Sequence, residues 1–174
     1  MTAKLIFVLF LSALMGKLSY AQTQFDVPEN IVLKTPADYA SYESTIIDAA
    51  KWLEGNDLNK EPDKRQAIID FVLRWLEGST AIVLELTDPV SKLYDKNDPL
   101  LGVFLASYAR NALENKSTPS KFNATKAAVI SIMMVYKKGI SIEKNKQMEK
   151  AIKMANENKL DEFIMDVLKV QKDY

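Results

Sequence analysis

Two stretches of this chain are apolar at nearly every position, which leaves no polar face for water to contact. The first, LLGVFLASYA, spans residues 100–109, and the second, AAVISIMMVY, spans residues 127–136. A helix with this pattern is surrounded by protein on most sides. We therefore expect helices over 98–115 and 120–138 that pack against each other as the centre of the core.

Other segments place apolar residues at helical spacing and predict amphipathic helices. They are residues 36–55, 62–77, 141–158 and 160–170, and a short helical turn is expected over 88–94. The first two end alike, in KWLEG and RWLEG. We interpret this ending as an aromatic and a leucine facing the core, a solvated glutamate, and a left-handed glycine cap.

Helix starts and stops have recognisable residues. Thr35, Pro36 and Asp38 form the pattern of a capping box with proline in the first turn. Asp98 is the expected N-cap of the central helix, and Gly139 is expected to end the helix over 120–138.

Two segments lack a helical period. Residues 22–34, QTQFDVPENIVLK, should run extended as a strap with apolar side chains lying in a groove. Residues 79–87, STAIVLELT, alternate like a strand, and either pair with a short partner such as 140–142 or run as a linker with side chains in the core. The chain thus predicts a mainly all-α fold: an irregular bundle of about six helices over 35–174, with a short extended segment near 80–87.

The N-terminus has the pattern of a signal peptide. Lys4 precedes the apolar run 5–15, and Ser19 and Ala21 are small residues at the expected spacing before a cleavage site. We expect export to the periplasm or outside the cell after cleavage near Ala21, and no stable membrane insertion afterwards, because the apolar runs are too short to span a bilayer. The chain has no cysteine, so we expect no lipoprotein anchor. An exported chain of this size without disulfides favours a bacterial source.

Composition excludes several kinds of chemistry. The 23 basic residues balance the 23 acidic ones, so overall charge predicts no nucleic-acid binding. The absence of histidine and cysteine excludes histidine triads and ordinary zinc, haem and iron–sulfur sites. The acidic loops at 57–61 and 95–98 do not fit a calcium-binding loop, because proline or leucine occupies the position that needs glycine. We expect no metal, no cofactor and no catalytic residue of a recognised class.

Lysines are concentrated near the C-terminal end, where seven of them lie between Lys137 and Lys159 beside three glutamates. Such a surface could contact anionic lipid or a polyanion. The interspersed acids and the modest apolar face favour a solvated outer surface instead.

The candidate ligand-binding residues are Arg110, with Tyr108 and Glu114 on the same helix, and Glu85. Arg110 either anchors an anionic ligand or forms an ion pair with Glu114 or with the loop DKND, and the ion pair is favoured. Glu85 is the one acid within an apolar run and could act with Asp88, Asp95 or Glu114 in carboxylate-pair hydrolysis. A strand with a solvated face explains Glu85 more simply.

Five segments together resemble a family of small exported α-helical proteins of Bacteroidota: AAKWLEG (49–55), FVLRWLEGS (71–79), LASYARNALEN (105–115), KAAVISIMMVYKKG (126–139) and KLDEFI (159–164). No activity is assigned to that family. The resemblance implies export and a helical fold, and it transfers no catalytic residue.

These observations favour an exported binding or interaction module over an enzyme. Its partner would be an unidentified protein or a small envelope ligand, bound beside Arg110 or along residues 79–87, where an extended partner could add a strand. Two alternatives stay open. One is a hydrolase that uses carboxylates alone, for example on envelope glycans, and the other is a structural homo-oligomer formed through the extended segment.

Overall fold

The computed structural model describes residues 24–173, so the predicted signal peptide over 1–21 lies outside the described residues. Helix is the one regular secondary structure in this part of the chain, which confirms a mainly all-α multi-helix fold. The elements are α2 (Pro36–Ser41), α3 (Glu43–Gly55), α4 (Pro62–Gly78), α5 (Asp88–Ser91), α6 (Pro99–Glu114), α7 (Lys121–Lys137), α8 (Lys146–Asn156), α9 (Leu160–Glu162) and the π-helix η1 (Phe163–Val167).

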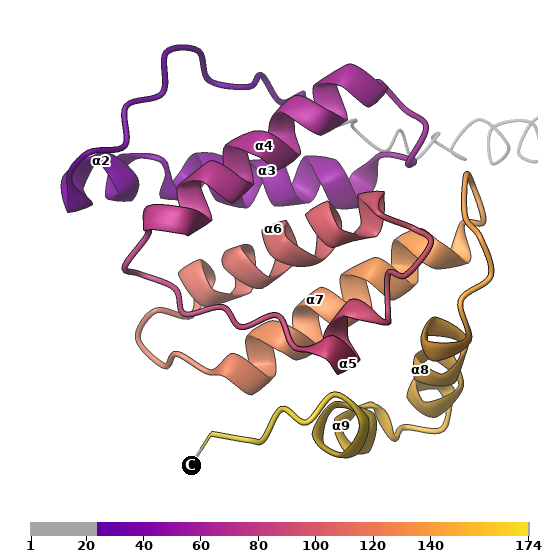
Figure 1. Ribbon diagram of the computed structural model, residues 1–174. Helices are drawn as coiled ribbons and strands as arrows, with labels where there is room; N and C mark the ends of the chain where they lie inside the picture. Colours follow the sequence, from indigo (N-terminus) through magenta and orange to yellow (C-terminus); the bar gives the residue numbers. More distant parts are fainter. Residues whose placement is uncertain (1–23, 174) are drawn as a thin grey trace, which may run out of the picture.

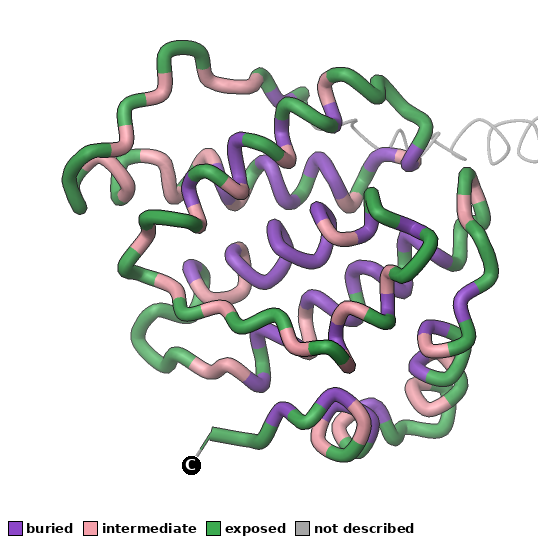
Figure 2. Tube along the Cα trace, in the orientation of Figure 1, coloured by how far each residue is buried: buried purple, intermediate pink, exposed green. Residues whose placement is uncertain are grey.

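Helix α6 lies at the centre, in contact with α3, α4 and α7 (Figure 1). Residues 100–109 are buried except for the half-buried Leu101, which confirms the predicted apolar core helix (Figure 2). Its predicted neighbour α7 packs against it, and most of residues 127–136 are buried too. The expectation that α7 is enclosed holds only in part, because Met134 is 52% exposed on its outer side.

The helix ends match the sequence patterns in two places and differ in three. Thr35 forms the predicted capping box with Asp38, and Gly139 has the left-handed conformation, with φ of 70°. Asp98 makes no side-chain cap hydrogen bond, because its own backbone is already helical. Gly55 and Gly78 are the last residues of α3 and α4 and have no positive φ, so neither is the predicted left-handed cap.

Three predicted helices have different bounds in the structure. The first is divided at Tyr42 into α2 and α3. The helix expected from residue 141 begins only at Lys146, because the Asn145 side chain accepts the N–H of Met148 and sets the N-cap there. The segment expected to be helical over 160–170 is the short α9 followed by η1.

The two extended segments cover the helices. In the described part of the strap Phe25 is buried, Ile31 and Leu33 pack against the core, and Arg74 donates to the carbonyl of Ile31. Residues 79–87 form no strand within the described chain and therefore do not pair with 140–142. They form a linker that crosses α6 and α7, with Ile82 and Leu84 against the core.

Among the helices of residues 24–173, none combines the length and the apolar character needed to cross a bilayer.

The crossing of α4 and α6 depends on Gly102, because a Cβ atom there would overlap the side chain of Ile69. Ile69 is β-branched and stiff, so it cannot move aside easily. We expect Gly102→Ala to lower the free energy of unfolding by about 1–3 kcal/mol in urea denaturation. Ile69→Ala should recover part of this loss in the double variant, and additive effects of the two substitutions would contradict the close contact.

Candidate functional site

The four candidate residues occupy two separate places. Arg110 and Glu114 lie where α6 meets α3. Glu85 belongs to the extended segment 79–87, and Tyr108 lies beside that segment, with its hydroxyl donating to the carbonyl of Val83 at 2.9 Å. The structure therefore does not combine them into one site.

Arg110 pairs with a residue that the sequence analysis placed in solvent. Its Nη1 donates to Glu54 at the end of α3, and the Glu54 side chain is only 11% exposed. Glu114, the partner expected from sequence, is 46% exposed and lies 3.9 Å from Nε of Arg110. The predicted ion pair with Glu114 is therefore present at the long distance of 3.9 Å, and the closer, less exposed partner Glu54 was not predicted.

Glu54 is the centre of a polar network between three helices. Besides Arg110, its carboxylate accepts a hydrogen bond from Ser131 on α7 at 2.8 Å. The Ser107 hydroxyl on α6 has two acceptors for its one proton, this carboxylate and the carbonyl of Val103, each at 2.6 Å. Both serines are buried within the two apolar helices, where a hydroxyl needs a partner. These contacts give Glu54 and Arg110 a structural role and occupy the carboxylate fully.

No local pattern predicts the burial of Glu54, because Glu77 occupies the same position in RWLEG and is exposed. The buried serines were the available signal, since each needs an acceptor inside an apolar core.

A second buried charge was missed by sequence reasoning. Arg65 on α4 is 3% exposed and donates to the carbonyls of Leu53, Asn56 and Asp57 at the end of α3. Burial lowers its pKa, and the charge of Asp57 opposes that shift. Arg65 thus satisfies the free carbonyl groups of one helix with a side chain from the next.

Within residues 24–173, the extended segment 79–87 lacks backbone–backbone hydrogen bonds over most of its length. No backbone N–H or C=O of residues 80–86 makes a backbone hydrogen bond within the described chain. Val83 is 82% exposed, while its neighbours Ile82 and Leu84 are half-buried, so exposure alternates as in a strand. This is the condition of an unpaired sheet edge.

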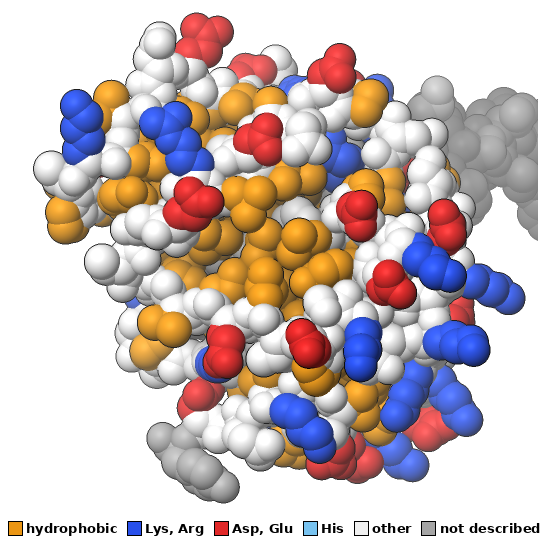
Figure 3. All heavy atoms as spheres, viewed as in Figure 1, with side chains coloured by type: hydrophobic (Ala, Val, Ile, Leu, Met, Phe, Trp, Pro, Cys, Tyr) orange, Lys and Arg blue, Asp and Glu red, His pale blue; other side chains and the backbone are white. Residues whose placement is uncertain are grey.

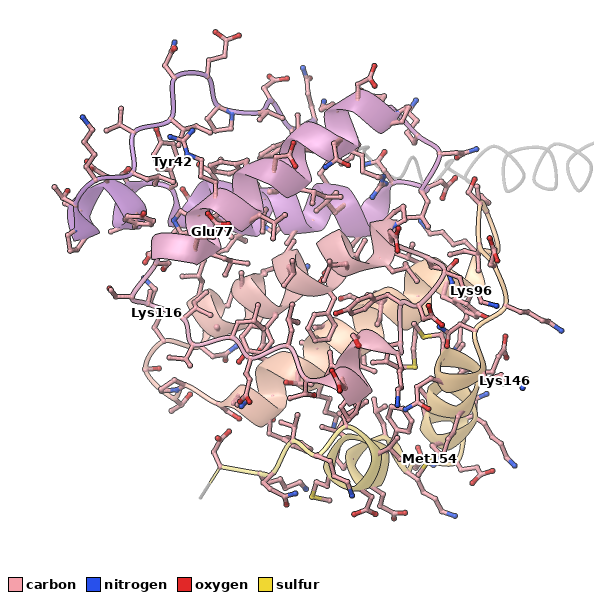
Figure 4. The ribbon with its side chains drawn as sticks, viewed as in Figure 1. Tyr42, Glu77, Lys96, Lys116, Lys146 and Met154 are labelled. Atoms are coloured by element: carbon pink, nitrogen blue, oxygen red, sulfur yellow. The ribbon has the colours of Figure 1, made fainter. Side chains whose placement is uncertain are left out.

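A recess lies on each side of this segment. One, of about 410 Å³, is lined by residues that include Ile82, Tyr108, Lys116 and Lys121. The other, of about 420 Å³, has Glu77 as its one charged lining residue, and its remaining lining residues are Leu73, Leu76, Ile82, Val83, Leu84, Leu86, Leu101 and Leu105. Figure 3 shows hydrophobic side chains gathered in the middle of this face, and Figure 4 labels Glu77 and Lys116, which line the two different recesses.

The charges beside the segment are paired. Glu85 is 65% exposed and forms an ion pair with Lys121 at 2.6 Å, whose hydrogen bond lowers the pKa of Glu85. At the start of α7, Asp173 accepts from Ser120 and from the N–H of Phe122, and the Ser120 hydrogen bond lowers the pKa of Asp173. Within residues 24–173, no three acidic side chains come together as a metal site would require.

No protein-family model, no curated protein and no solved structure matches this chain. The resemblance to exported proteins of Bacteroidota stays a prediction.

We expect Glu54→Gln to lower the free energy of unfolding by about 2–4 kcal/mol, because Arg110 would lose its main carboxylate and the amide would not satisfy every donor. Chemical denaturation of the variant measures this loss. Glu114→Gln is the matched control, since Glu114 is exposed and more distant, and should change stability by less than about 1 kcal/mol. Equal effects of the two substitutions would contradict the central role of Glu54.

Tyr108 makes stability sensitive to alkaline pH. Burial raises its pKa to about 12, and the negative charge of Asp173 adds to the shift. In the unfolded chain the hydroxyl titrates near its ordinary value of 10.0, so the unfolded state loses this proton first. The contribution of Tyr108 is therefore complete below pH 10 and is lost as the pH rises towards 12. Urea denaturation between these values should show a smaller fall in stability for Tyr108→Phe than for the unsubstituted protein, and an equal fall would contradict the assignment.

Proposed function

We propose that this protein is an exported binding module, periplasmic or secreted, that holds an extended segment of a partner polypeptide along residues 79–87. The single observation that carries the proposal is the absence, within the described chain, of backbone–backbone hydrogen bonds from residues 80–86. Export rests on the signal-peptide pattern that ends near Ala21.

The geometry suits a partner that adds a strand. Val83 turns its carbonyl towards Tyr108, and in an extended chain successive residues direct their backbone groups to opposite edges. Ile82 and Leu84 therefore direct theirs to the other edge, away from Tyr108. A partner strand on that edge would satisfy these groups and place alternate side chains in the apolar recess beside Leu73 and Leu86.

Affinity and specificity would come from different parts of this surface. Backbone hydrogen bonds accept any sequence, whereas the apolar recess favours medium-sized apolar side chains at every second position. Exposed Val83 and the 45% exposed Leu86 add apolar surface that a partner would bury. The partner is therefore an extended peptide with alternating apolar residues.

The carboxylate hydrolase receives no support from this geometry. Such a hydrolase needs an acid with a raised pKa that faces another acid in a cavity. Glu85 is exposed with a lowered pKa, and Glu114 is exposed beside Arg110.

Peptides selected from a random phage-displayed library on the mature protein provide the direct test. We expect enrichment of alternating apolar sequences, and N-methylation of alternate peptide residues on one edge should abolish binding. Val83→Lys should weaken binding about tenfold or more, because a charged residue blocks an edge strand. Met134→Lys, which also replaces an exposed apolar residue but lies on α7, is the control and should leave binding intact.

Three results would contradict the proposal. They are the absence of any enriched alternating peptide, equal effects of Val83→Lys and Met134→Lys, and a dimer in light scattering that Val83→Lys converts to monomer. The last result would assign the segment to a second copy of this chain and favour the homo-oligomer instead.

A further inference from the structure

A basic recess of about 450 Å³ lies between the chain that follows α5 and the start of α8. Its lining residues are Lys92, Asp95, Lys96, Lys144, Asn145, Lys146 and Gln147. Lysines on both rims outnumber the acids by four to one. Figure 3 shows basic side chains, with acidic ones among them, over this part of the molecule, and Figure 4 labels Lys96 and Lys146 on the two rims.

Two asparagines hold the rims together. Asn97 exchanges hydrogen bonds with the backbone of Glu143, donating at 3.0 Å and accepting at 2.8 Å. The buried Asn145 donates to the carbonyls of Lys92 and Asp95 at 2.9 and 3.0 Å. Each rim therefore has a fixed position relative to the other, although the two are far apart in sequence.

The four lysines have no charged partner within the described chain. Lys121 and Lys126 form ion pairs with Glu85 and Asp161. Among residues 24–173 the recess lysines form none, as is also true of Lys150 and Lys153 on α8, but the recess brings four such lysines together in one hollow. Lys96 also has a φ of 65°, a conformation that is uncommon for a residue with a side chain and is found preferentially at functional sites. Like charges that line one recess repel each other, and a bound anion relieves the repulsion.

We propose that this recess binds a small phosphate-bearing anion. Lysine ammonium groups bind phosphate as point charges, and Gln147 contributes an amide donor at the same rim. The volume suits a small molecule rather than a polymer. The inference is independent of peptide binding along residues 79–87, because none of the recess residues lines either hollow beside that segment.

Isothermal titration with inorganic pyrophosphate at low ionic strength tests the proposal on the mature protein. The double variant Lys96→Gln/Lys146→Gln removes one lysine from each rim. The control Lys150→Gln/Lys153→Gln removes the same charge from α8 outside the recess. We expect the recess variant to bind about tenfold or more weakly and the control to change by less than about twofold. Circular dichroism establishes that each variant is folded.

A vesicle assay distinguishes a free anion from a lipid headgroup as the source of the phosphate group. It uses anionic phosphatidylglycerol vesicles, with zwitterionic phosphatidylcholine vesicles of zero net charge as the comparison. If the protein binds pyrophosphate and the recess variant does not, the ligand is a free phosphate-bearing anion. If the protein sediments with phosphatidylglycerol vesicles but does not bind pyrophosphate, and only the recess variant loses this sedimentation, the ligand is a lipid headgroup. Absence of binding in both arms, or an equal loss in the recess variant and the control, overturns the proposal, because attraction would then be spread over the whole lysine-rich surface.

Discussion

Burial of α6 on nearly every side is the constraint on which this structure depends. A helix without a polar face loses its hydrophobic stabilisation wherever it meets water, so its neighbours must cover it. Helices α3, α4 and α7 cover most of it, and Gly102 permits the close crossing with α4. The same burial explains Glu54, because Ser107 and Arg110 on α6 need an acceptor within the core.

The part of α6 that no helix covers is crossed by residues 79–87. Ile82 and Leu84 pack against the core and contribute to its closure. The backbone of this segment gains one hydrogen bond from α6, at the carbonyl of Val83, but no ladder of them, because helices use their own backbone groups internally. A packed linker with an unsatisfied edge is therefore a direct consequence of covering a helix with an extended chain.

Sequence patterns predicted what depends on local periodicity and missed what depends on long-range contacts. The apolar runs located α6 and α7, and Thr35 and Gly139 marked two helix ends correctly. Glu54 and Glu77 follow the same local pattern, but only tertiary packing decides which of them is buried. The start of α8 was misplaced because Asn145 acts through contacts with Lys92 and Asp95, which are distant in sequence.

The two proposed binding surfaces were visible in sequence only as an alternating segment and a group of lysines. The arrangement of the helices decides whether residues 79–87 pair within the chain. It also decides which lysines share a recess. The unpaired backbone beside a buried helix is the central claim.

Amide hydrogen exchange of the free monomeric protein tests that claim most directly. The account predicts that the amides of Ile82 and Leu84 exchange at rates close to those of an unstructured peptide. The amides of residues 103–109 on α6 should exchange only through global unfolding. Strong protection of Ile82 and Leu84 in the monomer, or rapid exchange throughout α6, would contradict it.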